Sequence, residues 1–272
     1  MFLQKIISVL LFLYKIISGL GRKFIEYVLA VARAWIFIFE IFYKAVTPPY
    51  RFKLIVQQLH AVGAQSVVVV ALVGFFTGAV LAVQGEYTLS RFGATAYVGG
   101  MTALALIREL GPVLTALMVN GRAGSAMTAE LGIMKISEQV DALRSMAVDP
   151  IRYLMVPRVI AGIISVPLLT MIFNAVGIFG GYLVGVENLG LSSGVFMARI
   201  VSSVQDVDVW SSLIKSLCFG LVISWVACYK GWTCGFGAVG VNRATTSSVV
   251  TSSVAILVLD YFLTSILNVT MF

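Results

Sequence analysis

Five long apolar segments restrict what this chain can fold into more than any other feature. They run from Ser66 to about Gln84, Tyr97 to about Val119, Tyr153 to Val184, Trp210 to Tyr229, and Val249 to about Val269. An α-helix of roughly 20 apolar residues crosses the hydrocarbon core of a bilayer. Only 11% of the residues are charged, too few to cover a water-soluble surface. The sequence therefore predicts an all-α polytopic membrane protein, a single domain over residues 1–272 with a five-span bundle over 66–270.

The first 45 residues have a different, amphipathic pattern. Five charged residues are separated by nearly whole numbers of helical turns, namely Lys15, Arg22, Arg33, Glu40 and Lys44. They share one face if the segment is helical, and the rest of its surface is largely apolar. We expect a helix over residues 1–45 that lies in the membrane interface as an elbow before the bundle. A spanning helix with one polar seam is the alternative.

The basic residues are distributed unevenly between the predicted loops. The loops on one side of the membrane hold fifteen Lys and Arg: eight in the first 60 residues, five from Arg122 to Arg158 and two from Lys230 to Arg243. The other side holds only Arg91 and Arg199. The positive-inside rule then places the N-terminus and the loop after the second span in the cytoplasm, and the C-terminus outside. Topology thus explains the net charge of +7 better than nucleic acid does, and no nucleic-acid partner is expected.

Four ionisable residues fall inside predicted spans: Arg108, Glu109, Lys215 and Asp260. Each would cost roughly 2.5–3.5 kcal/mol at the bilayer centre if unpaired. Two are positive and two negative, so we expect a polar network that links the second, fourth and fifth spans. Pro112 removes a backbone hydrogen bond to the carbonyl of Arg108, which predicts a kink or break beside the charges. The network either lines or gates a substrate cavity, or is purely architectural.

Two further features follow in the polar insert after the second span. Small residues between Gly121 and Ala129 predict a surface for close helix contact, within the chain or across a dimer. A short helix is expected over residues 137–149, with Ser137 as its N-cap and Asp149-Pro150 as its end. Its apolar stripe consists of Val140, Leu143, Met146 and Ala147. Such a helix either docks into a groove on a partner or folds back onto its own bundle.

No motif in the sequence indicates catalysis, a metal or a cofactor. His60 is the only histidine, and the three cysteines form no CxxC pair. Gly235-x-Gly237-x-x-Gly240 matches a dinucleotide fingerprint, but no βαβ unit surrounds it, and it reads better as a turn before the fifth span. We expect a chain that is not an enzyme and has no ATPase site of its own.

Several runs resemble MlaE-type permeases of ABC lipid transporters, and the similarity covers the chain from about Gln65 onward. These runs are RELGPVLTAL from Arg108, NGRAGSAMTAELG from Asn120, EQVDAL from Glu138, MAVDPIRY from Met146, Pro157-Arg158, GVNRATTSSVV from Gly240, and LDYFLT from Leu259. The N-terminal 45 residues are similar only in character.

The resemblance implies a function and a set of partners. The chain would be the homodimeric permease of a bacterial inner-membrane transporter for phospholipid. A cytoplasmic ATPase that binds the ATP would dock on the coupling helix, a periplasmic MCE-domain ring would cover the outer face, and a small STAS-domain protein would bind the ATPase. The resemblance assigns Arg108, Glu109, Lys215 and Asp260 to the family's charged positions, and Leu81, Leu89 and Leu110 to its lipid cavity. The coupling helix would present Glu138, Val140, Asp141, Leu143, Met146 and Asp149.

Two other functions remain open at this point. Glu109 or Asp260 could carry a proton in a secondary transporter, although the sequence has no visible inverted repeat. The chain could also be a membrane scaffold that transports nothing.

Overall fold

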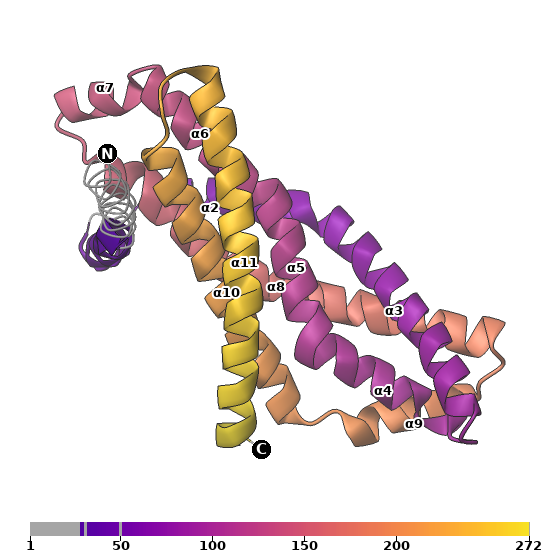
Figure 1. Ribbon diagram of the computed structural model, residues 1–272. Coiled ribbons are helices and arrows are strands. Elements are labelled where there is room, and N and C mark those ends of the chain that lie inside the picture. The colour runs from indigo at the N-terminus through magenta and orange to yellow at the C-terminus, as the bar shows by residue number, and fades with distance from the viewer. Residues whose placement is uncertain (1–27, 30–31, 49–50, 272) are drawn as a thin grey trace, which may run out of the picture. The chain divides into compact units, whose positions relative to one another are not determined.

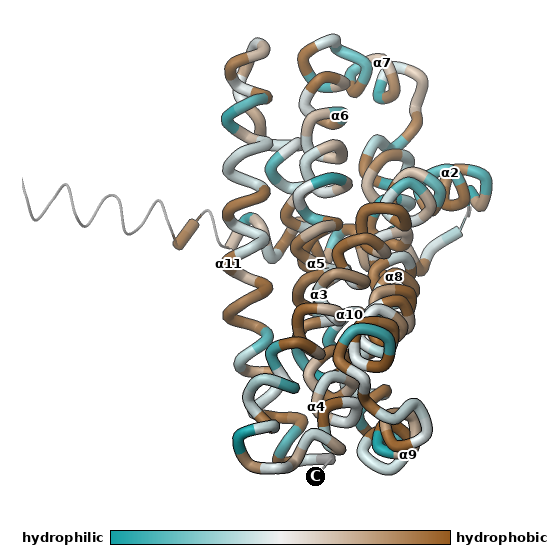
Figure 2. The backbone as a smooth tube through the Cα atoms, turned by 90° about the vertical axis from the view of Figure 1, so that its right-hand side faces the viewer, coloured by the Kyte–Doolittle hydropathy of each residue, from teal (hydrophilic) through white to brown (hydrophobic). Residues whose placement is uncertain are grey.

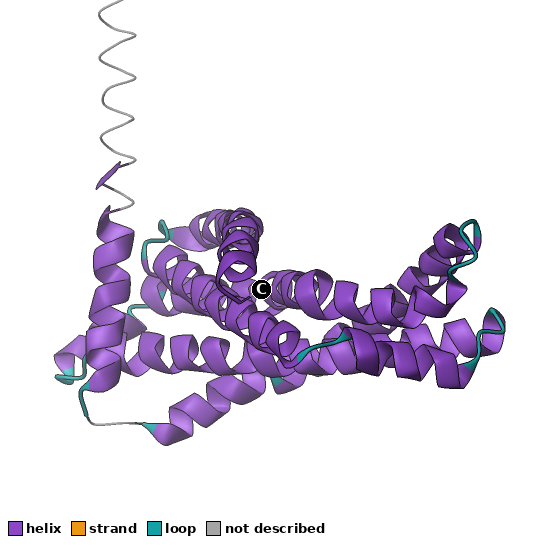
Figure 3. Cartoon of the chain, turned by 90° about the horizontal axis from the view of Figure 1, so that it is seen from below, coloured by secondary structure: helices purple, strands orange, loops and turns teal. Residues whose placement is uncertain are grey.

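The computed structural model describes residues 28–29, 32–48 and 51–271, and no strand occurs in those ranges (Figures 1 and 3). Five helical runs in this part of the chain are long and apolar enough to cross a membrane. They are Phe52–Ser90, Thr95–Ile136, Ile151–Asn188, Asp206–Trp232 and Gly237–Thr270. The predicted all-α architecture with five spans is confirmed. Figure 2 shows apolar residues along α3 and α8, whereas hydrophilic residues gather in α2 and α7.

Contacts divide the chain into two units, Met1–Pro48 and Pro49–Phe272. In the first unit, residues 32–46 are helical. The ammonium group of Lys44 donates to Glu40 Oε1 over 2.7 Å, so two of the charged residues expected on one helix face pair there. Lys15 and Arg22 lie outside the described residues. An interfacial position for residues 1–45 stays a prediction.

In the second unit, α3 (Val67–Ser90) and α8 (Val156–Leu183) pack closely through glycines. A Cβ atom on Gly78 would lie 1.8 Å from the carbonyl oxygen of Gly177, and one on Gly74 would lie 2.8 Å from that of Phe173. The backbones of the two helices therefore approach as only glycine permits. This contact holds the first and third spans together.

The second span is one helical run interrupted by two π-helical segments. In order it comprises α4 (Val98–Ala105), η3 (Leu106–Leu110), α5 (Gly111–Val119), η4 (Asn120–Gly124) and α6 (Ser125–Ile136). Pro112 is the second residue after η3, so the regular α-helix is broken beside the charges, as predicted. The run extends well past the predicted end at Val119, because the small-residue stretch and the residues after it are also helical.

Helices α7 (Gln139–Ser145) and α9 (Ser193–Ser203) mark opposite ends of this unit (Figure 1). The turn between α10 (Asp206–Trp232) and α11 (Gly237–Met271) lies at the α7 end, and the C-terminus lies at the α9 end (Figure 1). Gly237 opens α11 with a φ of +76°, as the predicted glycine-rich turn requires.

The structure contains two helices that the sequence reading did not expect. Residues 51–60 lie before the first predicted span, yet α2 (Phe52–Val62) is a helix that packs on α8. α9 forms where a loop was expected, and it packs on α4 with Phe196 buried. α11 also begins twelve residues before the predicted start at Val249, since its polar first third is helical.

The main hydrophobic core lies where α3, α5, α8 and α10 meet. Its members include Val70, Ala116, Phe173, Phe219 and Ile223, with Ile256 from α11. A smaller cluster of Ala82, Val98 and Phe196 lies at the α9 end. α10 is the most buried of the five spans and α11 the least, so most of the α11 surface is left uncovered by this chain.

Candidate functional site

The four charged residues predicted inside spans form one connected cluster. Lys215, on α10, is only 1% exposed and lies between two carboxylates. Its ammonium nitrogen is 2.8 Å from Glu109 Oε2 on η3 and 3.3 Å from Asp260 Oδ1 on α11. It also donates to the backbone carbonyl of Arg108 over 2.9 Å. Two hydrogen bonds, to Glu109 and Arg108, and one ion pair, with Asp260, thus connect the fourth span to the second and the fifth, as the sequence predicts.

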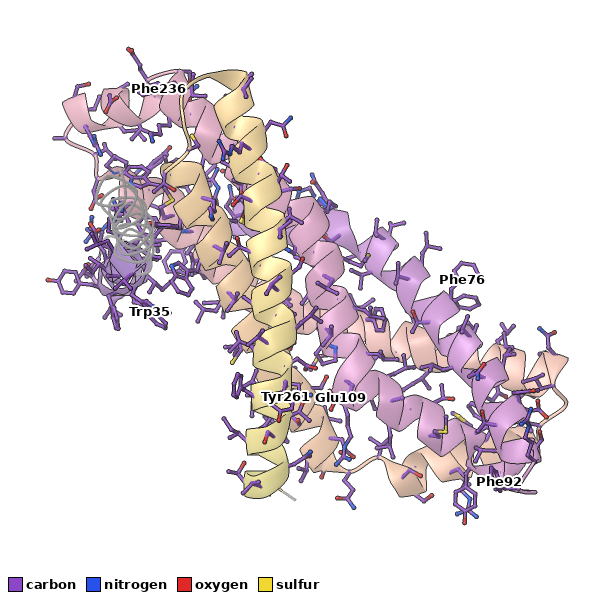
Figure 4. The ribbon with its side chains drawn as sticks, in the orientation of Figure 1. Trp35, Phe76, Phe92, Glu109, Phe236 and Tyr261 are labelled. Carbon is purple, nitrogen blue, oxygen red and sulfur yellow. The ribbon has the colours of Figure 1, made fainter. Side chains whose placement is uncertain are left out.

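α11 closes the cluster through a second side chain. The hydroxyl of Thr264, about one turn beyond Asp260, donates to Glu109 Oε2 over 3.3 Å. In the view of Figure 4, Glu109 lies beside α11. Glu109 therefore accepts from both α10 and α11, although its side chain is 45% exposed. This carboxylate is the most open group of the cluster.

Asp208 belongs to the cluster and was missed by sequence reading. Its carboxylate oxygen Oδ1 lies 2.5 Å from Arg108 Nε, and Oδ2 accepts the backbone N–H of Gln205 over 2.9 Å. Gln205 and Asp208 form a capping box at the start of α10. A polar residue followed three positions later by Asp, just before an apolar run, is a signal for the start of a helix, but it does not indicate a partner for Arg108. The side chain is 2% exposed, so it is a buried partner for Arg108.

The cluster has a buried side and an open side. Lys215 and Asp208 are enclosed, Asp260 is 21% exposed, and Arg108 and Glu109 are 36% and 45% exposed at their side chains. Among these five residues three are acidic and two are basic. The arrangement can hold a polar or charged group against the open side while the enclosed pairs keep the charges fixed.

The three leucines assigned to a lipid cavity lie apart. Leu81 lines an apolar groove of about 450 Å³ along α3, whose other lining residues are Leu72, Val73, Phe76, Thr77 and Val80. Leu89 packs instead on the small cluster at the α9 end. Leu110 is half-buried on η3, next to Glu109. Two turns of α3 separate Leu81 from Leu89, about 12 Å along the axis, whereas Leu110 is the direct neighbour of Glu109 in the sequence.

The short helix of the polar insert is present as α7, shorter than predicted. Ser137 is not its N-cap: Ser137 ends α6, and its hydroxyl donates to the carbonyl of Ile133 over 2.8 Å. Glu138 begins α7 in a left-handed conformation with φ of 58°, which turns the chain sharply between the two helices. Asp149 accepts the N–H of Ile151 over 3.0 Å and so helps to start the next span, while Ala147 has a φ of 56°.

The predicted apolar stripe of α7 does not all face outward. Val140 is 4% exposed and packs into its own chain, Leu143 is half-buried, and Met146 is 65% exposed. Asp141 pairs with Arg144 over 3.2 Å on the exposed face. Val140 therefore anchors this helix to its own bundle, whereas Met146 is accessible, and docking of the helix on a partner stays a prediction.

The small residues between Gly121 and Ala129 also divide between two faces. Ala123 and Gly124 are buried, and a Cβ atom on Gly124 would lie 3.2 Å from Ile223 of α10. Gly121 is exposed, with nothing of this chain within 4 Å of its would-be Cβ. The close contact predicted for this stretch occurs within the chain on one face, and the other face is open.

Comparison with known proteins yields consistent matches over nearly the whole chain. A family model described as Permease MlaE matches residues 55–266. The intermembrane phospholipid transport system permease protein MlaE of Haemophilus influenzae is 42% identical over 252 residues, covering 92% of this chain and 97% of that protein. A probable ABC transporter permease protein of Rickettsia conorii is 42% identical over 254 residues, covering 93% of this chain and 98% of that protein. The chloroplastic protein TRIGALACTOSYLDIACYLGLYCEROL 1 of Arabidopsis thaliana is 41% identical over 209 residues, covering 77% of this chain and 60% of that protein.

Proposed function

The chain belongs to the MlaE permease family, and on that premise we propose that it moves phospholipid between its membrane and a periplasmic MCE-domain protein. It is a multi-pass membrane protein and a permease of an ABC transporter. The observation that carries the proposal is the near full-length match to a permease named for intermembrane phospholipid transport. A separate ATPase supplies the energy.

The charge cluster supports a lipid substrate. A phospholipid needs apolar walls for its chains and a few polar groups for its headgroup. Leu110 adjoins the half-exposed Glu109, and the groove along α3 that contains Leu81 is almost entirely apolar. We propose that Arg108 and Glu109 face the headgroup. Lys215, Asp260 and the enclosed Asp208 hold them in place.

The surface of α7 supports the docking of an ATPase. Met146 and the half-buried Leu143 offer apolar contact, and Glu138, Asp141 and Asp149 lie around them. A seven-residue helix is not stable alone, but Val140 holds this one to the bundle. We place α7 and the N-terminus on the cytoplasmic side and the C-terminus on the periplasmic side of the bacterial inner membrane, as the distribution of basic residues predicts.

The exposed surface of α11 supports a homodimer. Only 11% of the residues in its most apolar stretch are buried within this chain. The helix nevertheless contributes Asp260 and Thr264 to the cluster. A second copy packed against α11 would enclose the two clusters between the protomers. A STAS-domain protein bound to the ATPase completes the proposed assembly.

The proposal is tested by ATP-driven lipid transfer. The permease, its ATPase and the MCE-domain protein are reconstituted in vesicles that contain a fluorescent phospholipid, and transfer is measured with ATP. Transfer should require ATP and vanish when the ATPase is inactivated in its nucleotide site. Transfer that continues without ATP but stops when the proton gradient is collapsed would favour a secondary transporter using Glu109 or Asp260. Absence of transfer under both conditions would favour a scaffold.

A further inference from the structure

One uninterrupted helix connects α7 to the charge cluster. α10 is α-helical from Asp206 to Trp232, whereas the route through the second span contains the two π-helical segments η3 and η4. π-Helical segments interrupt the regular hydrogen-bond ladder and let a helix deform. Lys215 and Trp232 are 17 positions apart, which corresponds to about 25 Å along the axis. A displacement at one end of α10 therefore reaches the other with little loss.

The α7 end of α10 is attached to both helices of the polar insert. The guanidinium of Arg144, on α7, lies over the Trp232 ring at 5.6 Å from its centroid. The ammonium of Lys135, on α6, donates to the carbonyl oxygens of Trp232 and Cys234 over 2.9 and 3.0 Å. A cation at these carbonyls matches the partial negative charge of a helix C-terminus. Arg144 thus joins α7 to the end of α10, and Lys135 joins α6 to the same end.

The sides of α10 are packed so closely that it must move with its neighbours. A Cβ atom on Gly220 would lie 2.5 Å from the carbonyl oxygen of Gly162 on α8, and one on Gly231 would lie 2.8 Å from Leu131 on α6. Its other end carries Asp208, paired with Arg108, and Lys215, paired with Glu109 and Asp260. The same helix holds the α7 contact and the cluster.

We propose that α10 transmits the movement of α7 to the charge cluster, with Trp232 and Lys135 as the positioning residues that couple ATP hydrolysis to lipid movement. This inference rests on the proposed function, because α7 moves when the ATPase docked on it changes shape. In this proposal both residues act through the position of α10 and not by contacting lipid or nucleotide.

The test compares Trp232→Ala and Lys135→Met with Trp232→Phe and Lys230→Met in the assembled transporter. The Phe variant keeps an aromatic face under Arg144. Lys230 is a matched lysine at the same end of α10 whose ammonium bonds to Ser247 rather than to the insert. In the first two variants the ATPase should co-purify at the wild-type level and hydrolyse ATP. The lipid moved per ATP should fall about fivefold. Both controls should retain the wild-type ratio.

A double variant tests whether Arg144 and Trp232 act as a pair. If they do, Arg144→Gln combined with Trp232→Ala should lower the ratio no further than Trp232→Ala alone. Additive losses would overturn the inference. So would a wild-type amount of lipid moved per ATP in both Trp232→Ala and Lys135→Met. An equal loss in Lys230→Met would overturn it as well.

A readout that does not depend on lipid separates this inference from the proposed function. Cys218 lies one turn beyond Lys215 on α10 and is partly exposed, whereas Cys228 and Cys234 are buried. Its reaction rate with a membrane-permeant maleimide should change when the ATPase is trapped with ATP and vanadate. That change should disappear in Trp232→Ala. A wild-type complex that shows the change but moves no lipid would refute the function and leave the coupling intact. Persistence of the change in Trp232→Ala would overturn the coupling.

Discussion

The ammonium nitrogen of Lys215 lies 2.9 Å from the backbone carbonyl oxygen of Arg108. Proline at position 112 has no N–H to offer that oxygen, so an ordinary helical bond from four residues ahead is impossible. The lysine therefore does more than neutralise carboxylates, because it also satisfies backbone at the point where the second span departs from α-helix. The contact between Lys215 and the carbonyl of Arg108 therefore links the ion cluster to the backbone break beside Pro112.

The first prediction concerns Lys215 itself. Lys215→Met should lower the free energy of unfolding by about 3–5 kcal/mol, because it leaves Glu109 and Asp260 without their shared cation. Neutralising those carboxylates as well, with Glu109→Gln and Asp260→Asn, should recover much of the loss. Unfolding in detergent measures both changes, and Lys53→Met, at an exposed position of α2, is the control. A triple variant no more stable than the single one would contradict this account.

The second prediction concerns Asp208. Asp208→Asn keeps an oxygen to cap α10 but removes the charge that holds Arg108, so lipid transfer should fall while the complex still assembles. We expect a loss of about tenfold, since a charge-assisted hydrogen bond contributes roughly 1.5–3 kcal/mol. Asp206→Asn is the matched control, because Asp206 lies in the same first turn and is exposed. Equal transfer rates for the two variants would show that the Arg108–Asp208 pair is not needed.

The third prediction tests the contact between the first and third spans. Gly78→Ala places a methyl group 1.8 Å from a backbone oxygen of α8, and no side-chain rotation can relieve that overlap. The helices must separate, and we expect a loss of about 1–3 kcal/mol or more in unfolding free energy. Gly194→Ala, where nothing lies within 4 Å, should leave the melting temperature unchanged. A stable Gly78→Ala protein would mean that α3 and α8 adjust more freely than the glycines indicate.

Charge placement made much of the site predictable. Arg108, Glu109, Lys215 and Asp260 stand out because each interrupts an apolar run, and their opposite signs required partners. Asp208 did not stand out because it precedes the apolar part of α10 and resembles an ordinary loop residue. Only the tertiary position of Arg108 reveals it as a buried partner.

Helix boundaries were harder to predict than spans. Ser137 fitted an N-cap, but the helix before it continues through Ile136 and Ser137 ends it. The fifth span was predicted to begin at Val249, yet α11 begins at Gly237, because packing on α6 and α10 keeps the polar residues before Val249 helical. In both places tertiary packing overrides the local preference for a helix end, and that packing cannot be inferred from one sequence.

The last prediction separates the two faces of α7. Met146→Asp should reduce co-purification of the ATPase at least about tenfold without changing the melting temperature, because the side chain is 65% exposed and its loss affects only a partner. Leu143→Asp, at a half-buried position, should weaken binding and lower stability together. Val140→Asp should mainly destabilise the permease, since it buries a charge at a position that is 4% exposed.

Ser145→Asp provides the control for these three variants. Ser145 is exposed on the same helix but lies outside the apolar stripe, and its hydroxyl bonds only to the carbonyl of Ala142 over 2.8 Å. Its ATPase binding should match the wild type, so a loss with Met146→Asp cannot be a general effect of added negative charge on α7. If Met146→Asp binds the ATPase as well as Ser145→Asp does, α7 is not the docking helix. The packing of Val140 would then only hold α7 to its own bundle.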